Sequence, residues 1–430
     1  MKKIILVSAI AIVIISKLYS SSTDDVQSKI REVLDALPAS TELGILIYNP
    51  LTEDTIYSVN HTRSMIPASN TKLFTTATAL TIMGSDFVFY TKILADTNSI
   101  VNDNISGNLY IKGYGNPVFT SEDMDSLVEQ LVKLGIKKIT GNIIGDDTFF
   151  DNVYTRDDWI KDEKANVKLP PISALVVDRN TKIIRKKRRG RWRNYRVNVS
   201  NPPQHAAELL KHKLVEAGIE ISGKTMVGKS PADAKVLVES PVILNHLIQL
   251  INKNSDNFLA ECLFKSIGAV ASGEQGNSFY STQTILTFIE DNGIYSKGTA
   301  VVDGSGISRF DQITAGAIVG LLEKMYFDLN NFPDFYNSLS IAGVDGTLEN
   351  RINESGPDII FRGKTGTLNG VSSLAGYLTT KNGDEIIVSM IFEFTRGGSN
   401  KYRNAQDKII GILNDWFEET PEEMVPQGYK

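Results

Sequence analysis

The spacing of apolar residues predicts helices and strands at both ends of the chain. Residues 24–37 and 409–416 place apolar side chains every three or four positions, which is typical of amphipathic helices. Apolar runs bounded by turn residues predict strands at residues 42–48, 55–59, 373–379 and 385–392. Since both ends contribute a helix and strands, we expect a mixed α/β (α+β) fold, in which one antiparallel sheet built from both termini is flanked by helices.

The first residues have the pattern of a secretory signal. Met1-Lys2-Lys3 precedes an apolar run from Ile4 to Ile15, which is short for a membrane span, and small polar residues follow that run. The pattern predicts a signal peptide at residues 1–21 and an exported protein, periplasmic or extracellular. An uncleaved N-terminal anchor is the alternative.

The composition is that of a globular protein, with 42% apolar and 22% charged residues. After a signal peptide roughly 400 residues remain, which is too long for one ordinary core, so two domains are expected. The single cysteine, Cys262, lies in an apolar helical run and cannot form an internal disulfide. It is predicted to pack in a core.

A serine and a lysine three residues apart are the first candidates for chemistry. Ser69 and Lys72 stand where Pro67 leads into a run of helix formers, so they share one helical face. A serine hydroxyl is a poor nucleophile until a base takes its proton, and a lysine with a depressed pKa can be that base. Ser-x-x-Lys alone is weak, because such a pair is expected by chance in a chain of this length.

Two downstream motifs strengthen this interpretation. Ser255-Asp256-Asn257 opens a helical run, and Lys364-Thr365-Gly366-Thr367 follows the apolar run Ile359-Ile360-Phe361. Ser-x-x-Lys, Ser-x-Asn and Lys-Thr-Gly, in this order, form the signature of serine β-lactamases and penicillin-binding proteins. Ser-x-Asn is the weak member, since it occurs elsewhere in the chain as well.

The stretches around these motifs resemble the D-alanyl-D-alanine carboxypeptidase/endopeptidase family typified by penicillin-binding protein 4. They are residues 254–261, 302–309, 342–348 and 363–368. The resemblance runs from about Gly44 to the C-terminal helix. It implies a serine β-lactamase/transpeptidase-like fold with an inserted second domain.

The long separation of Ser69 from Ser255 agrees with such an insertion. After the signal peptide, we expect a discontinuous transpeptidase-like catalytic domain of residues 22–84 and 236–430. The inserted domain would comprise residues 85–235 and include a short basic segment at 182–196.

That basic segment contains nine cations: Lys182, Arg185, Lys186, Lys187, Arg188, Arg189, Arg191, Arg193 and Arg196. Removing nine cations from a net charge of −5 would leave −14, so positive charge is concentrated here in an otherwise acidic chain. The simpler interpretation of the segment is a solvated hairpin tip, and the functional interpretation is a surface that binds an anionic wall polymer. Nucleic acid is disfavoured, because an exported protein has little access to it.

The motifs of two other hydrolase classes are missing from the sequence. It has no Gly-x-Ser-x-Gly elbow of an α/β-hydrolase and no His-Glu-x-x-His helix of a zinc protease, and it contains only four histidines. His205 and Glu208 have the spacing of a zinc carboxypeptidase pair, but they start an amphipathic helix. No metal or cofactor is expected. Two Glu/Asn pairs have the spacing of a class A β-lactamase base but the wrong place among the motifs: Glu163 with Asn166, and Glu274 with Asn277.

The resemblance assigns a role to each motif residue. Ser69 would attack the carbonyl between two D-alanines, with Lys72 as the base. Ser255 would relay the proton to the departing amine, and Asn257 would hold Lys72 and the substrate amide. Repulsion from a charged Lys364, together with the positive end of the helix at Ser69, is expected to lower the pKa of Lys72.

The remaining candidates concern substrate binding. The terminal carboxylate of the substrate is expected to bind the amine of Lys364 and the hydroxyls of Thr365 and Thr367, and Gly366 belongs to the same motif. By resemblance, the backbone N–H groups of Ser69 and Thr367 would form the oxyanion hole. Glu163 ends the acidic stretch Asp157-Asp158-Trp159-Ile160-Lys161-Asp162-Glu163. By resemblance, Glu163 would receive the free amine of the substrate side chain, although the stretch departs from the family pattern at Lys161 and at Glu163 itself. The alternative is an acidic loop that only aids solubility.

These residues predict an exported serine D,D-carboxypeptidase/endopeptidase that hydrolyses D-Ala-D-Ala ends or cross-links of peptidoglycan. β-Lactam antibiotics would then be covalent inhibitors, because they present a similar carbonyl and carboxylate. The alternatives are a β-lactamase or esterase of the same fold and a non-catalytic cell-wall-binding protein.

Overall fold

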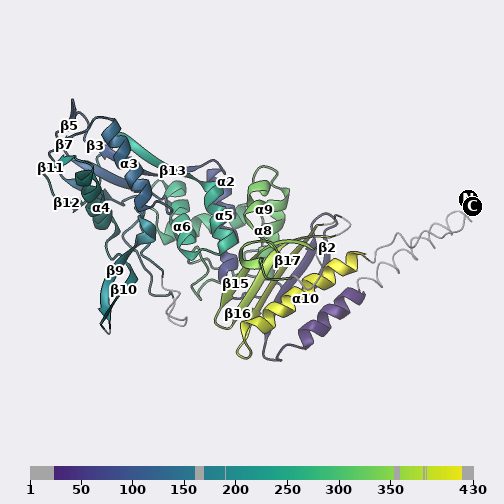
Figure 1. Cartoon of the computed structure of the whole chain (residues 1–430). Coiled ribbons are helices and arrows are strands. Elements are labelled where there is room, and N and C mark those ends of the chain that lie inside the picture. The colour runs from purple at the N-terminus through teal and green to yellow at the C-terminus, as the bar shows by residue number, and fades with distance from the viewer. Residues whose placement is uncertain are drawn as a thin grey trace, which may run out of the picture.

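One antiparallel sheet joins the two ends of the chain (Figure 1). The computed structural model describes residues 24–159, 169–188, 190–352, 359–380, 383 and 385–418. The six strands lie in the order β14 (Ser340–Ile341), β15 (Ile360–Leu368), β16 (Val371–Thr379), β17 (Glu385–Glu393), β1 (Glu42–Asn49) and β2 (Asp54–Val59). The pairing of β1 with β17 confirms the predicted sheet built from both termini.

This sheet is buried on both faces. Side chains alternate along β17, so Val388 and Met390 join one core while Ile387 and Ile391 join the other. The helix of residues 24–35 and α10 (Ser399–Glu418) cover the first face. A helical lobe covers the second face, formed by α2 (Thr71–Met83), α5 (Leu244–Asn254), α6 (Asn257–Ser272), α7 (Ser278–Asp291), α8 (Ala315–Phe327) and α9 (Phe332–Ser338).

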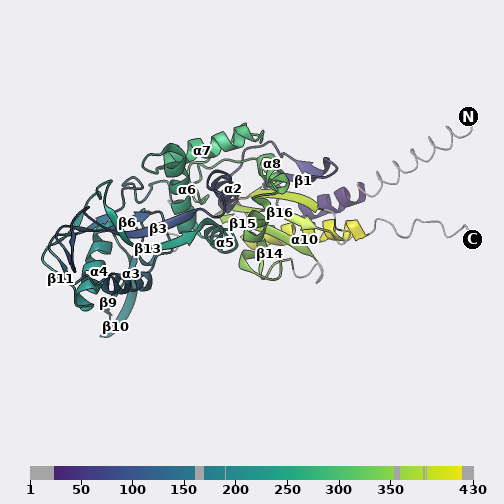
Figure 2. The same cartoon turned by 90° about the horizontal axis from the view of Figure 1, so that it is seen from above.

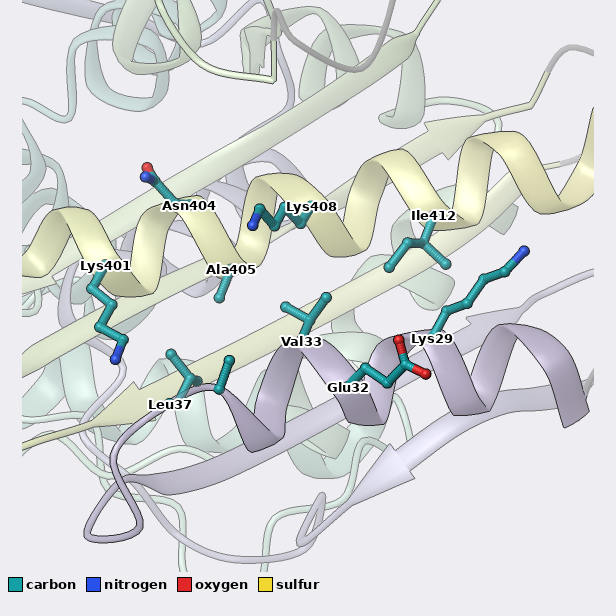
Figure 3. A pocket seen from close by; sticks show the side chains of 10 residues that line it. Lys29, Glu32, Val33, Leu37, Lys401, Asn404, Ala405, Lys408 and Ile412 are labelled. Carbon is teal, nitrogen blue, oxygen red and sulfur yellow. The ribbon is translucent and has the colours of Figure 1, made fainter.

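A shallow groove separates the helix of residues 24–35 from α10 (Figure 3). It has a volume of about 480 Å³, and Val33, Leu37, Ala405 and Ile412 form its apolar part. Lysines from both helices surround these apolar side chains. No candidate site residue lines the groove.

The chain between α2 and α5 forms a second body around its own core. One sheet has the order β12 (Thr225–Val227), β8 (Ile143–Asp146), β6 (Leu109–Tyr114), β3 (Val88–Ala95) and β13 (Lys235–Ile243). A smaller sheet has the order β11 (Glu220–Ile221), β7 (Lys138–Ile139), β5 (Asn104–Ile105) and β4 (Ile100–Val101). Two helices, α3 (Ser121–Lys133) and α4 (Pro202–Glu216), pack against these strands.

A two-stranded hairpin, β9 (Thr181–Arg188) and β10 (Arg191–Asn198), projects from this second body (Figures 1 and 2). Figure 2 shows the six-stranded sheet at one end of an elongated molecule and the second body at the other. Because β13 pairs with β3 as far as Ile243, we propose that the insertion extends to residue 243 rather than to 235.

No helix in the described part of the chain is long and apolar enough to cross a membrane. The expected signal peptide at residues 1–21 lies outside the described residues.

Candidate active site

Ser69 lies at the junction between a strained turn and the first helix of the lobe. It belongs to the short 3₁₀ helix η1 (Ala68–Asn70), which runs directly into α2. Ala68 has a φ of 49°, a left-handed conformation that costs a residue with a side chain about 1–2 kcal/mol. The turn is fixed on both sides, since Ser373 Oγ donates to the Pro67 carbonyl at 2.7 Å and Ile66 N donates to Glu393 at 2.6 Å.

Lys72 lies one turn further along, fully buried, with three oxygen atoms around its amine. Its Nζ is 2.9 Å from Ser69 Oγ, 2.6 Å from Asn257 Oδ1 and 2.6 Å from the carbonyl oxygen of Ser305. A neutral amine has two N–H groups and one lone pair. Two N–H groups directed at Asn257 and Ser305 leave the lone pair for the proton of Ser69, which is the arrangement that a general base requires.

Burial lowers the pKa of Lys72 from its ordinary value to about 8. The negative charges of nearby carboxylates oppose this effect, and Asp303 and Glu261 are the strongest of them. The direction agrees with the sequence-based expectation, but the leading cause is loss of hydration rather than repulsion from Lys364.

The Ser-Asp-Asn motif links two helices. Ser255 ends α5 in a left-handed conformation (φ 54°, ψ 42°), Asp256 accepts from Leu259 N at 3.0 Å as the N-cap of α6, and Asn257 is the first residue of that helix. Both carboxylate oxygens of Asp256 also bind the guanidinium of Arg179 at 2.8 Å. This sharp turn directs the Asn257 side chain to Lys72 and the Ser255 hydroxyl to Lys364.

Lys364 lies on β15 with its amine buried in the same site. Its Nζ donates to Ser255 Oγ at 2.8 Å and to the carbonyl of Thr365 at 2.9 Å. Burial, followed by the positive charge of Lys72, lowers the pKa of Lys364 well below its ordinary value. Lys72 has carboxylates nearby that favour its charged form, whereas no carboxylate among the described residues raises the pKa of Lys364. The expected charge on Lys364 is therefore disfavoured until an anion enters the site.

Gly366 allows β15 to approach the candidate nucleophile. A Cβ at this position would lie 2.1 Å from Ser373 Oγ, 2.9 Å from the Pro67 carbonyl and 3.0 Å from Ser69 N. The neighbouring Thr367 is exposed, and its hydroxyl accepts from Arg403 at 3.1 Å.

The hydroxyl of Thr365 donates to Thr347 Oγ1 at 2.8 Å in η4 (Gly346–Leu348). All three motifs therefore meet around Ser69 and Lys72.

A group of buried carboxylates lies behind Lys72, and sequence reasoning did not single it out. Glu261 accepts from the backbone of Gly304 and Ser305 at 3.0 and 2.8 Å, and Asp303 accepts from Ser305 and Gly306 at 3.1 and 2.6 Å. Burial, then the charge of Asp303, raises the pKa of Glu261 to about 8. The same two causes raise the pKa of Asp311 well above its ordinary value.

These carboxylates hold the turn at residues 303–306, whose Ser305 carbonyl binds Lys72. The available sequence signal was indirect. Glu261 and Asp303 stood in stretches noted for their family resemblance, and only the fold places them together.

The second body also contacts the turn at residues 303–306 and the residues that follow it. Arg156 and Asp158 form a two-point ion pair at 2.9 and 3.0 Å, and Ser308 Oγ donates to Asp158 at 2.7 Å. The indole N–H of Trp159 donates to Asp303 at 3.1 Å. The Trp-containing acidic stretch is therefore anchored beside the candidate active site. Glu163 itself lies outside the described residues.

The rival candidates occupy ordinary structural positions. His205 lies within α4, and Asn277 caps α7 by accepting from Tyr280 N at 2.9 Å. Cys262 is buried in the helical core, as predicted. Among the residues that the structure describes, no three His, Cys, Asp or Glu side chains are grouped so that they could hold a metal ion.

Comparisons with known proteins place this geometry in a family context. A family model described as Peptidase S13, the D-Ala-D-Ala carboxypeptidase 3 (S13) family, matches residues 26–196 and 186–415. The D-alanyl-D-alanine carboxypeptidase of Actinomadura sp. is 26% identical, over 83% of this chain and 80% of its own.

Solved structures show the same fold. Penicillin-binding protein 4 of Haemophilus influenzae aligns with a TM-score of 0.76 and 22% identity, over 91% of this chain and 98% of its own. That protein has also been solved with a β-lactam, and this second structure aligns with a TM-score of 0.72. A predatory endopeptidase of Bdellovibrio bacteriovorus, acylated by penicillin G, aligns with a TM-score of 0.53 and 15% identity, over 88% of this chain and 93% of its own.

Proposed function

The chain belongs to the D-Ala-D-Ala carboxypeptidase 3 (S13) family, and from this premise we propose that it cleaves the bond between two D-alanines through an acyl-enzyme on Ser69. The observation that carries the proposal is the placement of the buried Lys72 amine 2.9 Å from Ser69 Oγ, with its other two contacts made to oxygen acceptors. This arrangement suits removal of the serine proton as the hydroxyl attacks.

In the acylation step, neutral Lys72 takes the proton of Ser69 while Oγ bonds to the substrate carbonyl carbon. Negative charge develops on the carbonyl oxygen, and the backbone N–H groups of Ser69 and Thr367 are the proposed donors to it. Donors of this kind lower the barrier by several kcal/mol. The close approach of β15 to η1 at Gly366 supports this pairing of donors.

Collapse of the tetrahedral intermediate breaks the C–N bond, and the departing D-alanine amine needs a proton. This is the proton that Lys72 took from Ser69. Ser255 is the proposed relay, because its hydroxyl lies in the same site, hydrogen-bonded to the Lys364 amine at 2.8 Å. Asn257 keeps Lys72 in place and has an amide N–H₂ group available for the substrate. Water then hydrolyses the ester on Ser69 and regenerates the enzyme.

Lys364 and its two threonine neighbours are the proposed binding site for the terminal carboxylate of the substrate. An arriving carboxylate favours the protonated form of Lys364, which burial disfavours in the free enzyme. The substrate would thus restore the charge that binds it. The same recognition extends to β-lactams, in agreement with the β-lactam and penicillin G complexes of the structural relatives.

Further parts of the proposal concern where the enzyme works and on what. The basic and apolar N-terminal pattern supports export, with peptidoglycan peptides as substrates. Cross-link cleavage is included, because hydrolysis of the amide that a D-alanine carbonyl forms in a cross-link uses the same chemistry. Glu163 is proposed to receive a free amine of the substrate side chain, since its stretch is anchored beside the site through Trp159.

The test is covalent labelling of the purified protein with a fluorescent penicillin. Wild type should be labelled at Ser69, identified by mass spectrometry of the labelled peptide, while Ser69→Ala should fold normally and remain unlabelled. Release of label within seconds, with turnover of the drug, would instead indicate a β-lactamase. Labelling of Ser69→Ala at the wild-type rate would show that another residue is the nucleophile.

A further inference from the structure

The hairpin of residues 181–198, here called the basic hairpin, concentrates positive charge that the proposed catalysis does not use. Its eight described cations are all exposed: Lys182, Arg185, Lys186, Lys187, Arg188, Arg191, Arg193 and Arg196. The hairpin sequence contains no Asp or Glu. Within the described residues, none of these eight side chains takes part in an ion pair.

The strand register places like charges directly opposite one another. Arg188 faces Arg191 and Lys186 faces Arg193, on the same side of the hairpin. Like charges in opposed positions destabilise a strand pair, and an isolated two-stranded hairpin is only marginally stable. The two pairs are two residues apart along the strands, a separation of about 7 Å. Bound anionic groups would relieve this repulsion.

The opposite side of the hairpin is also cationic. Arg185, Lys187 and Arg196 share it with Trp192 and Ile183, which are 57% and 65% exposed. The Arg185 guanidinium lies 5.4 Å from the centre of the Trp192 ring. A flat membrane surface would contact one side, whereas a flexible polymer can bind cations on both.

Five of the eight described cations are arginines, whose planar forks match phosphate and carboxylate oxygens. We propose that the basic hairpin is a docking surface for a linear anionic polymer of the cell wall, bound through repeated phosphate groups. Its cations lie on an arm that leaves the second body and points away from the six-stranded sheet (Figures 1 and 2).

The arm is nevertheless tied to the candidate active site at its base. The short helix η3 (Asp178–Asn180) leads directly into β9, and within it Arg179 binds Asp256, the central residue of the Ser-Asp-Asn motif. A polymer on the hairpin would therefore hold Ser69 close to the wall while leaving the site open to peptide.

The experiment measures binding of the purified mature protein to poly(glycerol phosphate) at several salt concentrations, with phosphatidylglycerol vesicles as a second probe. The test variant changes Lys186, Arg188, Arg191 and Arg193 to Gln. A matched control changes four exposed lysines of the same body to Gln, at Lys133, Lys224, Lys229 and Lys235. Both variants lose the same charge, and hydrolysis of a soluble D-Ala-D-Ala peptide at the wild-type rate shows that each is folded.

The hairpin variant should bind the polymer at least about tenfold more weakly, while the control stays close to wild type. The logarithmic salt dependence should also become shallower by about 3, since each phosphate contact to a single strand contributes roughly 0.7. If both variants bind the polymer equally weakly, the loss of binding comes from the change in net charge alone, and the proposal is overturned. Tighter binding to vesicles than to polymer, lost on Trp192→Ala, would overturn it in favour of a membrane.

Discussion

The environment of Lys72 sets the pKa of its ammonium group, and therefore the fraction of molecules in which it can act as a base. Burial lowers the pKa of its ammonium to about 8, so about one molecule in ten carries the neutral amine at pH 7. Without the opposing carboxylates, burial would lower the pKa further and weaken the base. The buried acids Glu261 and Asp303 therefore have two effects, because they shape the turn that binds Lys72 and they raise its pKa.

A pH profile of acylation reports this proton. The second-order rate constant for penicillin acylation should rise with pH through a midpoint near 8, because only neutral Lys72 can accept the Ser69 proton. Lys72→Ala should lose acylation almost completely. Glu261→Gln keeps an oxygen for the backbone of Gly304 and Ser305 but removes the negative charge that Glu261 acquires when it ionises near pH 8, so the midpoint should move to lower pH.

Lys364→Ala is the informative comparison for this profile. It removes the proposed carboxylate partner, so the rate should fall while the midpoint stays near that of wild type, because burial is the leading cause of the lowered Lys72 pKa. A midpoint that rises in Lys364→Ala would show that repulsion between the two lysines controls the base. A midpoint that is the same in Glu261→Gln and wild type would show that Glu261 does not influence the pKa of Lys72.

At the scale of elements, the site depends on how closely β15 approaches η1. Gly366→Ala would place a methyl group 2.1 Å from Ser373 Oγ and 3.0 Å from Ser69 N, so the strand must move away from the nucleophile. Overpacking of this kind costs about 1–3 kcal/mol of unfolding free energy. We expect a comparable loss in a denaturant titration and a fall in penicillin acylation of at least about tenfold.

Gly398→Ala is the matched control, since an added Cβ there meets no atom within 4 Å. It should leave both stability and acylation close to wild type. If Gly366→Ala acylates as fast as this control, the close approach of β15 has no catalytic importance.

A second prediction at this scale concerns Trp159, which joins the second body to the turn at residues 303–306. Trp159→Phe keeps an aromatic ring but removes the N–H that donates to Asp303, a hydrogen bond to a charged group worth about 1.5–3 kcal/mol. Asp303 would then interact more strongly with Lys72, so the midpoint of the acylation profile should move to higher pH and the rate at pH 7 should fall several-fold.

Trp192→Phe makes the same change in the exposed basic hairpin and should have no such effect. A rate change in Trp159→Phe without movement of the midpoint would indicate that Trp159 supports the turn only sterically.

At the scale of the whole molecule, the sequence predicted the sheet because its strands keep a simple pattern. β1 and β17 are apolar runs with clear turns, and their pairing closes the two ends of the chain into one sheet. The proposed limit of the insertion at residue 243 could not be derived from the sequence, since it depends on the pairing of Lys235–Ile243 with β3. Local patterns do not reveal such a partner.

The candidate site likewise contains residues that the sequence predicted and residues that only the structure revealed. Ser69, Lys72, Ser255, Asn257 and Lys364 stood in short motifs with recognisable chemistry, and the structure brings them together. Glu261 and Asp303 had no comparable signal, and Trp159 stood out only as part of the acidic stretch that ends at Glu163. The effect of all three comes from burial and from contacts between distant segments. The leading cause of the Lys72 pKa was missed for the same reason, since burial is a property of the folded chain.

The remaining prediction concerns how the two bodies cooperate in choosing a substrate. Trp159 is anchored to the Asp303 turn, and Glu163 follows it by four positions along the chain. An amine about 4 Å from a partly exposed carboxylate gains roughly 1 kcal/mol, which corresponds to several-fold in rate. Glu163→Gln should therefore weaken the preference for a peptide with a free side-chain amine and leave the chemical step intact.

The measurement compares kcat/KM for a D-Ala-D-Ala peptide that has a free side-chain amine with kcat/KM for its acetylated counterpart. In wild type the ratio should favour the free amine, and in Glu163→Gln it should shrink several-fold, with the acetylated peptide hydrolysed as before. Glu274→Gln, at an exposed position before α7, is the control with the same loss of charge. A ratio that is the same in wild type and both variants would assign Glu163 to a solubilising loop, and the amine preference would then have to come from other residues of the site.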